Sequence, residues 1–472
     1  MADESNQITS EYFQNALEMK KKLDGISPSM CLAKWLQVSL HLTNGLTQSC
    51  YHPPTHKVSL EDLNSNPKAL HNTRIKHTER QQMRNGVRPP GCEYCWKVED
   101  AEGGHLSDRH FKSGESWARE NFDEVVLNKF DYNVNPRYVE VNFNHTCNLK
   151  CSYCSPQISS SWAEEARKHG PFPTSVPHND LTYFKNAGLM PIVEKGENPY
   201  LKAFWNWWPE LYPQLKVFRM TGGEPLLDKN TFKIFDWIQQ HPRPDLELAL
   251  TSNMCVPPEL MNKFINRVGP IVADRNVKEF RLFASVDTWG EQAEYIRNGL
   301  DFNYFWKNIN RYLTEVPEGI LNFIVTMNCL SIHNLQKLLE GVLELQKTYN
   351  KKTRRIFFDT PFLRDPAWMS MQILPDKKKL ELSRIIAFME RNPEQPDTLV
   401  GFRDFQIARM KRVSSWAMQT PLDAELSLCR TDLYLFFNEH DRRRNTDFLK
   451  TFPDLSEFWQ ICKESAERQG SY

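Results

Sequence analysis

The chain has 472 residues, enough for one large domain and one or two smaller ones. Its 40% hydrophobic and 25% charged residues are typical of a soluble globular protein. Lysine plus arginine equals aspartate plus glutamate at 59 each, so net charge offers no support for nucleic-acid binding. No apolar run reaches 18 residues, and the polar N-terminus lacks the apolar core of a signal peptide. We therefore expect no membrane association and a cytoplasmic protein whose eleven cysteines stay reduced.

Residues 1–135 form the first of three expected regions, and they contain four cysteines in a polar, proline-rich context. Cys92 and Cys95 make a C-x2-C pair, which Cys31 and Cys50 precede. Four thiolates can complete the ligand set of a four-iron cluster, and they can equally make a structural zinc site. A third alternative is that they pack as unliganded apolar side chains. The residues alone do not separate these alternatives.

Residues 136–374 alternate strand-like runs with amphipathic helices, which is typical of a parallel sheet. The expected strands are Tyr138–Phe143, Val217–Thr221, Glu247–Asn253, Glu279–Asp287, Leu321–Asn328 and Arg355–Asp359. Helices are expected at Asn230–Gln240 and Asn334–Leu345 from their apolar spacing. An insertion at about 155–215, which contains Trp205, Trp207 and Trp208, either covers a binding site or packs onto the sheet.

Polar and apolar residues alternate along several of these strands. In the first strand, Val139 and Val141 alternate with Glu140 and Asn142. Side chains alternate sides along a strand, and helices must cover the apolar side, so the polar set faces the interior. Because a closed barrel fills its interior with apolar residues, a polar interior indicates an open barrel that holds a polar ligand. A sheet with one face in water is the alternative.

The most informative motif follows the first strand, where Cys147, Cys151 and Cys154 are spaced C-x3-C-x2-C. Three thiolates do not close a tetrahedral zinc site. They suit a [4Fe-4S] cluster that keeps its fourth iron open for a small-molecule ligand. The second strand then runs into a turn of Gly222, Gly223 and Glu224, followed by proline.

From about Arg137 to Leu374 the two motifs together resemble the radical S-adenosylmethionine (SAM) enzymes, whose cluster loop is C-x3-C-x-aromatic-C and whose second strand ends in Gly-Gly-Glu-Pro. Tyr153 fills the aromatic position. The resemblance implies an α/β fold with a partial (β/α)6 barrel. It also implies that the three cysteines hold a [4Fe-4S] cluster to which SAM binds. Reductive cleavage of SAM there gives a 5′-deoxyadenosyl radical that abstracts hydrogen from substrate.

The resemblance implies SAM-binding roles for residues beyond the cluster loop. The backbone of Gly222 and Gly223, together with Glu224, is expected to meet the SAM ammonium, and glycine allows this close approach because it has no Cβ. Tyr153 is expected near the adenine.

The fourth strand and the residues after it supply further candidates. Ser285 and Asp287 resemble an S-x-D segment whose side chains accept hydrogen bonds from the ribose hydroxyls, or else they only cap the strand. Arg297 is expected near the SAM carboxylate, with which a guanidinium forms a bidentate pair. Asn253, which ends the third strand, is an additional candidate for SAM binding.

The N-terminal cysteines are similar to the auxiliary-cluster "twitch" (SPASM-like) domain of some radical SAM enzymes, here placed before the barrel instead of after it. That likeness favours a second, auxiliary [4Fe-4S] cluster over zinc within residues 1–135. Because the order along the chain is unusual, the pairing of the four ligands stays open. Residues 375–472 are expected to form a mostly helical C-terminal region.

We therefore expect a radical SAM enzyme that acts on a peptide or on a small molecule such as a nucleotide. A flavodoxin- or ferredoxin-type protein is the expected electron donor. The alternative is a non-catalytic iron–sulfur electron carrier or a zinc-stabilised binding module. Neither alternative needs the Gly-Gly-Glu turn or a polar barrel interior.

Overall fold

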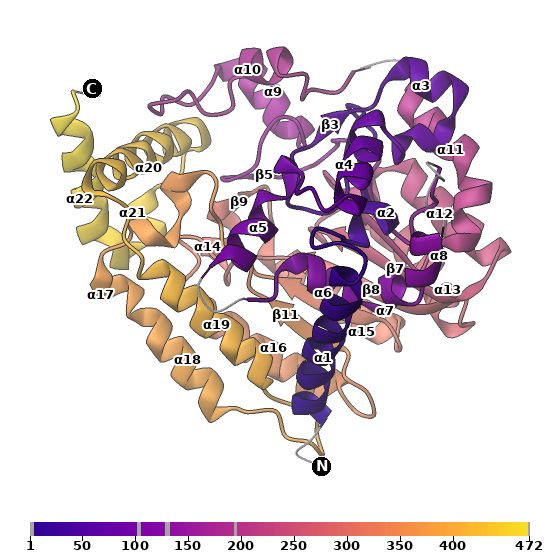
Figure 1. Ribbon diagram of the computed structural model, residues 1–472. Helices are drawn as coiled ribbons and strands as arrows, with labels where there is room; N and C mark the ends of the chain where they lie inside the picture. Colours follow the sequence, from indigo (N-terminus) through magenta and orange to yellow (C-terminus); the bar gives the residue numbers. More distant parts are fainter. Residues whose placement is uncertain (1–3, 102–104, 128–132, 193–195, 471–472) are drawn as a thin grey trace. The chain divides into compact units, whose positions relative to one another are not determined.

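The computed structural model describes residues 4–101, 105–127, 133–192 and 196–470. It divides into two compact units, the first of residues 1–145, 191–250 and 274–280, and the second of residues 146–190, 251–273 and 281–472. Helices and strands alternate through both, which confirms the predicted mixed α/β class (Figure 1). The functional domains expected from the sequence have boundaries near residues 135 and 374, which differ from the boundaries of the two compact units. Those domains stay a prediction.

The first unit contains a sheet with strand order β3–β2–β1–β4–β6–β7. Strands β1, β4, β6 and β7 are parallel, whereas β2 and β3 are added antiparallel at one edge. The strand bounds are β1 (Gln37–His41), β2 (Leu46–Gln48), β3 (His56–Lys57), β4 (Tyr138–Asn142), β6 (Val217–Thr221) and β7 (Arg243–Ser252).

Strands β1 to β3 were not among the strands expected from the sequence. Strand β1 pairs in parallel with β4, with Val38 opposite Val139 and Ser39 opposite Glu140. Its sequence alternates apolar and polar residues, but five residues of alternation are too few to distinguish a strand from a loop. The N-terminal region therefore supplies strands to the sheet that contains β4.

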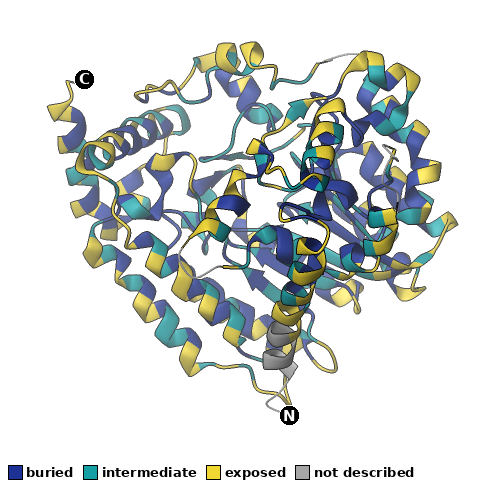
Figure 2. Cartoon of the chain, viewed as in Figure 1, coloured by how far each residue is buried: buried dark blue, intermediate teal, exposed yellow. Residues whose placement is uncertain are grey.

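The apolar face of this sheet is packed as predicted. Val139 and Phe218 are fully buried, and the Phe218 ring lies 5.0 Å from that of Trp208. Trp208 belongs to helix α11 (Pro199–Leu211), where Trp207 is also buried. Figure 2 shows the strands mostly in the buried colour. Of the two interpretations of the insertion, packing onto the sheet is confirmed for Trp208.

Helices surround the sheet of the first unit. Figure 1 shows α1 and α6 side by side, and the two helices are in contact. The helices of this unit are α1 (Glu4–Asp24), α2 (Ala33–Leu36), α3 (Leu60–Ser65), α4 (Arg74–Arg84), α5 (Glu93–Asp100), α6 (Asp108–Gly114), α7 (Ser116–Arg119), α8 (Phe122–Leu127), α11 and α12 (Lys229–Gln240). Helix α12 matches the helix expected at 230–240.

The second unit contains three parallel strands in the order β8–β10–β11 and a short antiparallel pair, β5 with β9. These strands are β5 (Lys150–Cys151), β8 (Val277–Ser285), β9 (Arg297–Asn298), β10 (Ile320–Ile324) and β11 (Ile356–Asp359). The helices up to β11 are α9 (Ser160–His169), α10 (Leu181–Asn186), α13 (Pro258–Ala273), α14 (Glu291–Ile296), α15 (Phe302–Glu315) and α16 (Leu335–Tyr349).

Residues 375–470 are mostly helical, as expected. Helices α20 and α22 pack together, and they run side by side in Figure 1. The C-terminal helices are α17 (Asp376–Lys379), α18 (Glu381–Arg391), α19 (Asp404–Ala417), α20 (Asp423–Arg444), α21 (Phe448–Thr451) and α22 (Ser456–Arg468). No helix within the described residues is long and apolar enough to cross a membrane.

All six strands expected in the middle region are present as β4, β6, β7, β8, β10 and β11. Their bounds shift by at most four residues, at the start of the third strand and at the end of the fifth. That strand ends at Ile324, four residues earlier than predicted, after which only an isolated bridge between Met327 and Phe362 remains.

Candidate functional site

The cysteine loop of the second unit is fixed by hydrogen bonds to its backbone. The indole of Trp162 donates to the Cys151 carbonyl at 2.9 Å, and the Ser159 hydroxyl donates to the Leu149 carbonyl at 2.9 Å. Both partners lie at the start of α9 or just before it. On the other side, β5 pairs with β9, which sets Cys151 opposite Arg297. The loop is therefore fixed from two sides before any ligand binds.

The three thiols of this loop interact electrostatically with one another. Burial raises the pKa of Cys154, and the Cys151 and Cys147 thiols raise it further. Burial likewise raises the pKa of Cys151, whereas the Arg297 guanidinium lowers it. The Cys151 and Cys154 thiols are thus neutral at pH 7 without metal, and they release protons when they become ligands. Three neighbouring thiols in one fixed loop fit the three protein ligands of an iron–sulfur cluster with one open iron.

A buried ion pair adjoins the loop. Arg297 donates to both carboxylate oxygens of Asp287, at 2.9 and 3.1 Å, and Tyr153 donates to both at 3.0 Å. One Nη of Arg297 lies 3.6 Å from the Cys151 sulfur. Asp287 is fully buried, and Arg297 is 6% exposed. The structure therefore brings three predicted SAM-site residues together, and they bind one another directly.

Asn253 contacts the cysteine loop from another side-chain position. Its side-chain amide donates to Asn148, inside the cysteine loop, at 2.9 Å, and its oxygen accepts from the Cys255 backbone at 2.8 Å. Ser285 is the last residue of β8, where it pairs with Ile324 of β10. Asn253 is therefore placed to orient the cysteine loop. The SAM contact that the sequence predicted for it stays a prediction.

The Gly-Gly-Glu turn lies in the first unit, directly after β6. Gly222 has φ +121°, and a Cβ built there would lie 2.3 Å from the Asn142 side-chain oxygen, so only glycine fits. Gly223 follows it, and Glu224 is 1% exposed. The Glu224 carboxylate accepts from the Leu226 backbone at 3.1 Å. The turn presents a buried carboxylate beside a backbone without side chains, which fits a small cationic group.

The four N-terminal cysteines come together in the first unit. Cys31, Cys50, Cys92 and Cys95 line one pocket. Cys31 precedes α2, Cys50 follows β2, and the other two stand at the start of α5. The structure thus brings four thiols from separate segments to the lining of one pocket. Across the described residues, no group of three or more His, Cys, Asp or Glu side chains is arranged to hold a metal ion.

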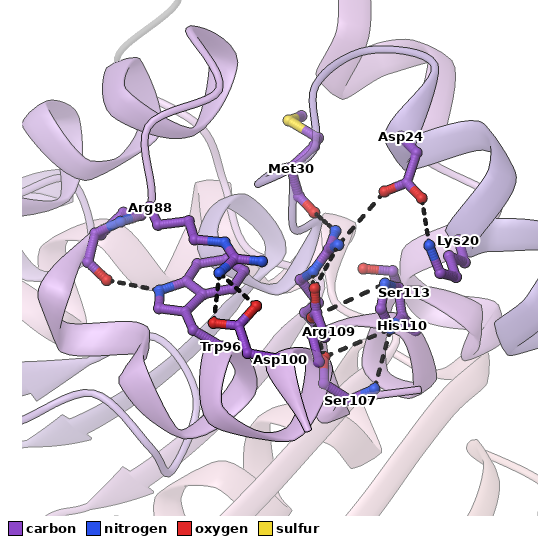
Figure 3. Close-up of polar contacts among 12 residues, drawn as sticks. Lys20, Asp24, Met30, Arg88, Trp96, Asp100, Ser107, Arg109, His110 and Ser113 are labelled. Atoms are coloured by element: carbon purple, nitrogen blue, oxygen red, sulfur yellow. Dashed lines mark hydrogen bonds and ion pairs between the residues drawn. The ribbon is translucent and has the colours of Figure 1, made fainter. Parts of the chain in front are cut away.

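Arg109 connects the segments that carry these cysteines (Figure 3). It donates to the Met30 carbonyl at 2.8 Å and to both Glu99 oxygens at 2.7 and 2.9 Å. Its guanidinium also lies 5.7 Å from the Trp96 ring. Met30 precedes Cys31, and Trp96 follows Cys95. One 3%-exposed arginine therefore holds two cysteine segments in place.

A second buried cation, Lys34, lines the same pocket. It is 2% exposed and pairs with Glu79 at 2.7 Å. Burial raises the pKa of Cys92, whereas the Lys34 cation lowers it. Burial also raises the pKa of Cys95, to about 12. Four thiols beside two buried cations fit a ligand set that is negatively charged once the thiols ionise.

Sequence reasoning did not identify Lys34, Arg109 or Trp162. Lys34 lies three residues after Cys31, which was the only available signal for it. Arg109 and Trp162 carry no local signal, because their roles depend on partners that the fold brings near.

No protein-family model matches the chain. The GTP 3′,8-cyclase of Sulfurimonas denitrificans is 25% identical over 223 residues, which is 47% of this chain and 55% of that protein. The GTP 3′,8-cyclase of Aliarcobacter butzleri is 26% identical over 232 residues, with the same two shares. The chain thus spans about half the length of the curated relatives it matches. These similarities support a place in the radical SAM superfamily.

Among solved structures, anSMEcpe with bound AdoMet aligns with 52% of this chain and 58% of its own. The two are 16% identical, with a TM-score of 0.33. A TM-score this low does not establish a common fold.

Proposed function

We propose that this protein is a radical SAM enzyme in which Cys147, Cys151 and Cys154 hold a [4Fe-4S] cluster. The observation that carries the proposal is the fixed loop in which three neighbouring thiols stand beside Arg297. When bound, the reduced cluster and SAM supply one-electron cleavage of SAM and a hydrogen-abstracting radical. The residues of this chain bind and orient those groups and keep water away.

Separate residues would then hold the parts of SAM. Glu224 and the backbone of Gly222 and Gly223 bind the ammonium, because a buried carboxylate beside a backbone without side chains suits a small cationic group. Arg297 binds the SAM carboxylate in exchange for part of its present contact with Asp287. Tyr153 lies near the adenine.

Three further residues complete the proposed SAM site. Ser285 and Asp287 accept hydrogen bonds from the ribose hydroxyls. Asn253 orients the cysteine loop through Asn148.

We further propose that Cys31, Cys50, Cys92 and Cys95 hold an auxiliary [4Fe-4S] cluster. Four protein thiolates leave no iron open, so this cluster serves electron transfer and not substrate binding. A flavodoxin- or ferredoxin-type protein supplies the electrons. Zinc at the same four thiols is the competing assignment, and metal analysis of the purified protein separates the two.

A peptide is the first proposed substrate. A nucleotide is the second, and the observation that favours it is the name of the curated relatives, GTP 3′,8-cyclases. Incubation with GTP, SAM and dithionite, followed by mass spectrometry of the nucleotide, decides on the second substrate.

The test of the enzymatic assignment is anaerobic reconstitution followed by assay of 5′-deoxyadenosine formation from SAM and dithionite. Wild type is expected to form it, and Cys151→Ala is expected to form none. Cys255→Ala, which removes a partly exposed cysteine outside both sets, is the matched control and should retain the activity. Equal product from wild type and Cys151→Ala would reject the proposal.

A further inference from the structure

One face of β1 carries three polar side chains, those of Gln37, Ser39 and His41, because alternate residues of a strand share a face. The register with β4 sets Ser39 beside Glu140 and His41 beside Asn142. In parallel strands, paired residues face the same side, so these polar groups form one continuous surface of the first unit.

This surface is buried, yet several of its polar atoms lack partners within the described chain. Gln37 is fully buried, and neither its amide nitrogen nor its amide oxygen has a hydrogen-bond partner there. The Ser39 hydroxyl, the His41 Nε2 and the Asn142 side-chain oxygen are also without one. An unsatisfied buried polar group destabilises the fold, so such a cluster requires an explanation.

The opposite face of β1 behaves differently. Val38 and Leu40 are at most 1% exposed and continue the apolar face that Val139 forms on β4. Core packing therefore explains one face of the strand and does not explain the other.

The charges on the polar surface are paired within it. Glu140 on β4 lies 3.5 Å from Arg219 on β6, and it also accepts a hydrogen bond from Tyr51 at 2.8 Å. Burial lowers the pKa of His41, which is therefore neutral at pH 7. The region around Gln37 thus presents uncharged donors and acceptors, and it matches a neutral polar group better than a phosphate or a carboxylate.

We propose that this surface binds an uncharged carboxamide-type group of the substrate, with Gln37 as its principal contact. The Gln37 amide offers a donor and an acceptor side by side, which is the complement of a C=O next to an N–H. Ser39, His41 and Asn142 add further donors and acceptors. The same chemistry is found in a peptide carboxamide and in the lactam edge of a nucleobase. The inference rests on the proposed function, because it places the substrate at the polar face of the sheet.

The position of β1 in the chain adds a second consequence. Cys31 lies before the strand and Cys50 after β2, so the hairpin of β1 and β2 connects two cysteines of the proposed auxiliary site. The N-terminal region then serves two purposes, since it holds the auxiliary cluster and supplies the substrate surface.

The test uses acetamide as the probe and saturation-transfer NMR of the anaerobic holoenzyme. Wild type should transfer saturation to acetamide, and Gln37→Leu should reduce the transfer at least fivefold. Gln336→Leu is the matched control, because Gln336 is exposed on α16 with Glu340 as its partner, and it should behave as wild type. The melting temperature of Gln37→Leu without ligand should equal or exceed that of wild type, since no hydrogen bond is lost.

Other results overturn the inference. They are an absence of transfer in wild type, transfer that does not depend on Gln37, or a lower melting temperature for both Gln37→Leu and Ser39→Ala. Competition against acetamide by N-acetyl-Gly-Asn-Gly-amide and by guanosine identifies the source of the group, and failure of both to compete also contradicts a substrate site.

Failure of the proposed function has a separate signature. If wild type forms no 5′-deoxyadenosine from SAM and dithionite, the enzymatic assignment is rejected, whatever Gln37→Leu does to acetamide. If SAM is cleaved and acetamide binding ignores Gln37, only the substrate surface is rejected.

Discussion

The two cysteine sites differ in how the chain assembles them. In the loop site, residues 147–154 supply all three thiols, and hydrogen bonds from Trp162 and Ser159 fix the backbone between them. In the N-terminal pocket, the thiols come from segments between residues 31 and 95, and the buried Arg109 holds two of those segments together.

The loop site is therefore formed by one short segment, whereas the N-terminal site depends on contacts between distant segments. A loop fixed through its own backbone keeps its thiols in place even when a distant side chain changes. A pocket assembled through buried charges depends on each charge, because a buried ion that loses its partner destabilises the fold. Changes at the two sites should therefore have distinct and separable effects.

The largest expected effect is the loss of one cluster without loss of the other. Cys151→Ala should remove the loop cluster, and a Cys92→Ala, Cys95→Ala double variant should remove the auxiliary one. Each should lower the iron content by about half, because both proposed clusters contain four irons. Iron and sulfide analysis of anaerobically reconstituted protein measures this. Loss of all iron from either variant would show that the two sites are not independent.

Removal of the central cation should affect the assembled site only. Arg109→Met removes the guanidinium from the partly buried Glu99, which keeps its hydrogen bond from Ser107, and should lower the free energy of unfolding by about 2–3 kcal/mol. Chemical denaturation of the protein without metal checks this value. Arg88→Met is the control, because its pair with Asp100 is exposed and should cost about 1 kcal/mol or less. Equal losses in the two variants would contradict the role given to Arg109.

Acid should destabilise both compact units, because each contains a histidine with a lowered pKa. Burial lowers the pKa of His110, beside Arg109, and of His440, in α20, to about 4. Each therefore stays neutral when folded but gains a proton near pH 6.5 when unfolded. Stability from each histidine is complete above pH 6.5 and falls between pH 6.5 and 4, by up to about 3 kcal/mol.

Unfolding free energies of His110→Gln and His440→Gln, measured across that pH range, should each show a flatter pH dependence than wild type. A slope that neither substitution reduces would assign the acid sensitivity to other groups.

The glycine turn tests a requirement of shape. Gly222→Ala should lower stability by about 1–3 kcal/mol, because a Cβ at φ +121° is strained and meets Asn142. It should also weaken SAM binding, measured by equilibrium dialysis. Gly188→Ala is the control, since Gly188 also has positive φ but open space around it. Unchanged SAM affinity in Gly222→Ala would remove the turn from the binding site.

The smallest expected effect concerns the support of the loop. Trp162→Phe removes one hydrogen bond to the Cys151 carbonyl, which still accepts from the Cys154 backbone, so about 1 kcal/mol of stability should be lost. Trp205→Phe, which loses an indole bond to Asn230, is the matched control. Only Trp162→Phe should slow cluster insertion, followed by absorbance. Equal insertion rates would show that Trp162 does not position the loop.

The sequence predicted the features that depend on local patterns. The spacing of Cys147, Cys151 and Cys154 identified the loop, and alternation along the strands identified the apolar face that is buried. Strand β1 was missed because its alternation is short and its meaning depends on pairing with β4. Arg109 was missed for a similar reason, because its role depends on its partners. Met30 is distant in the chain, and Glu99 carries no sequence signal of its own.

The central claim is that the loop cysteines, and not the N-terminal four, hold the cluster to which SAM binds. The most direct test is EPR of the dithionite-reduced protein with and without SAM, for wild type and for the variant with Cys147, Cys151 and Cys154 changed to alanine. The account predicts two cluster signals in wild type, one of them altered by SAM, and only the unaltered signal in the variant. A SAM-altered signal that persists in the variant, or no effect of SAM on iron-replete wild type, would contradict it.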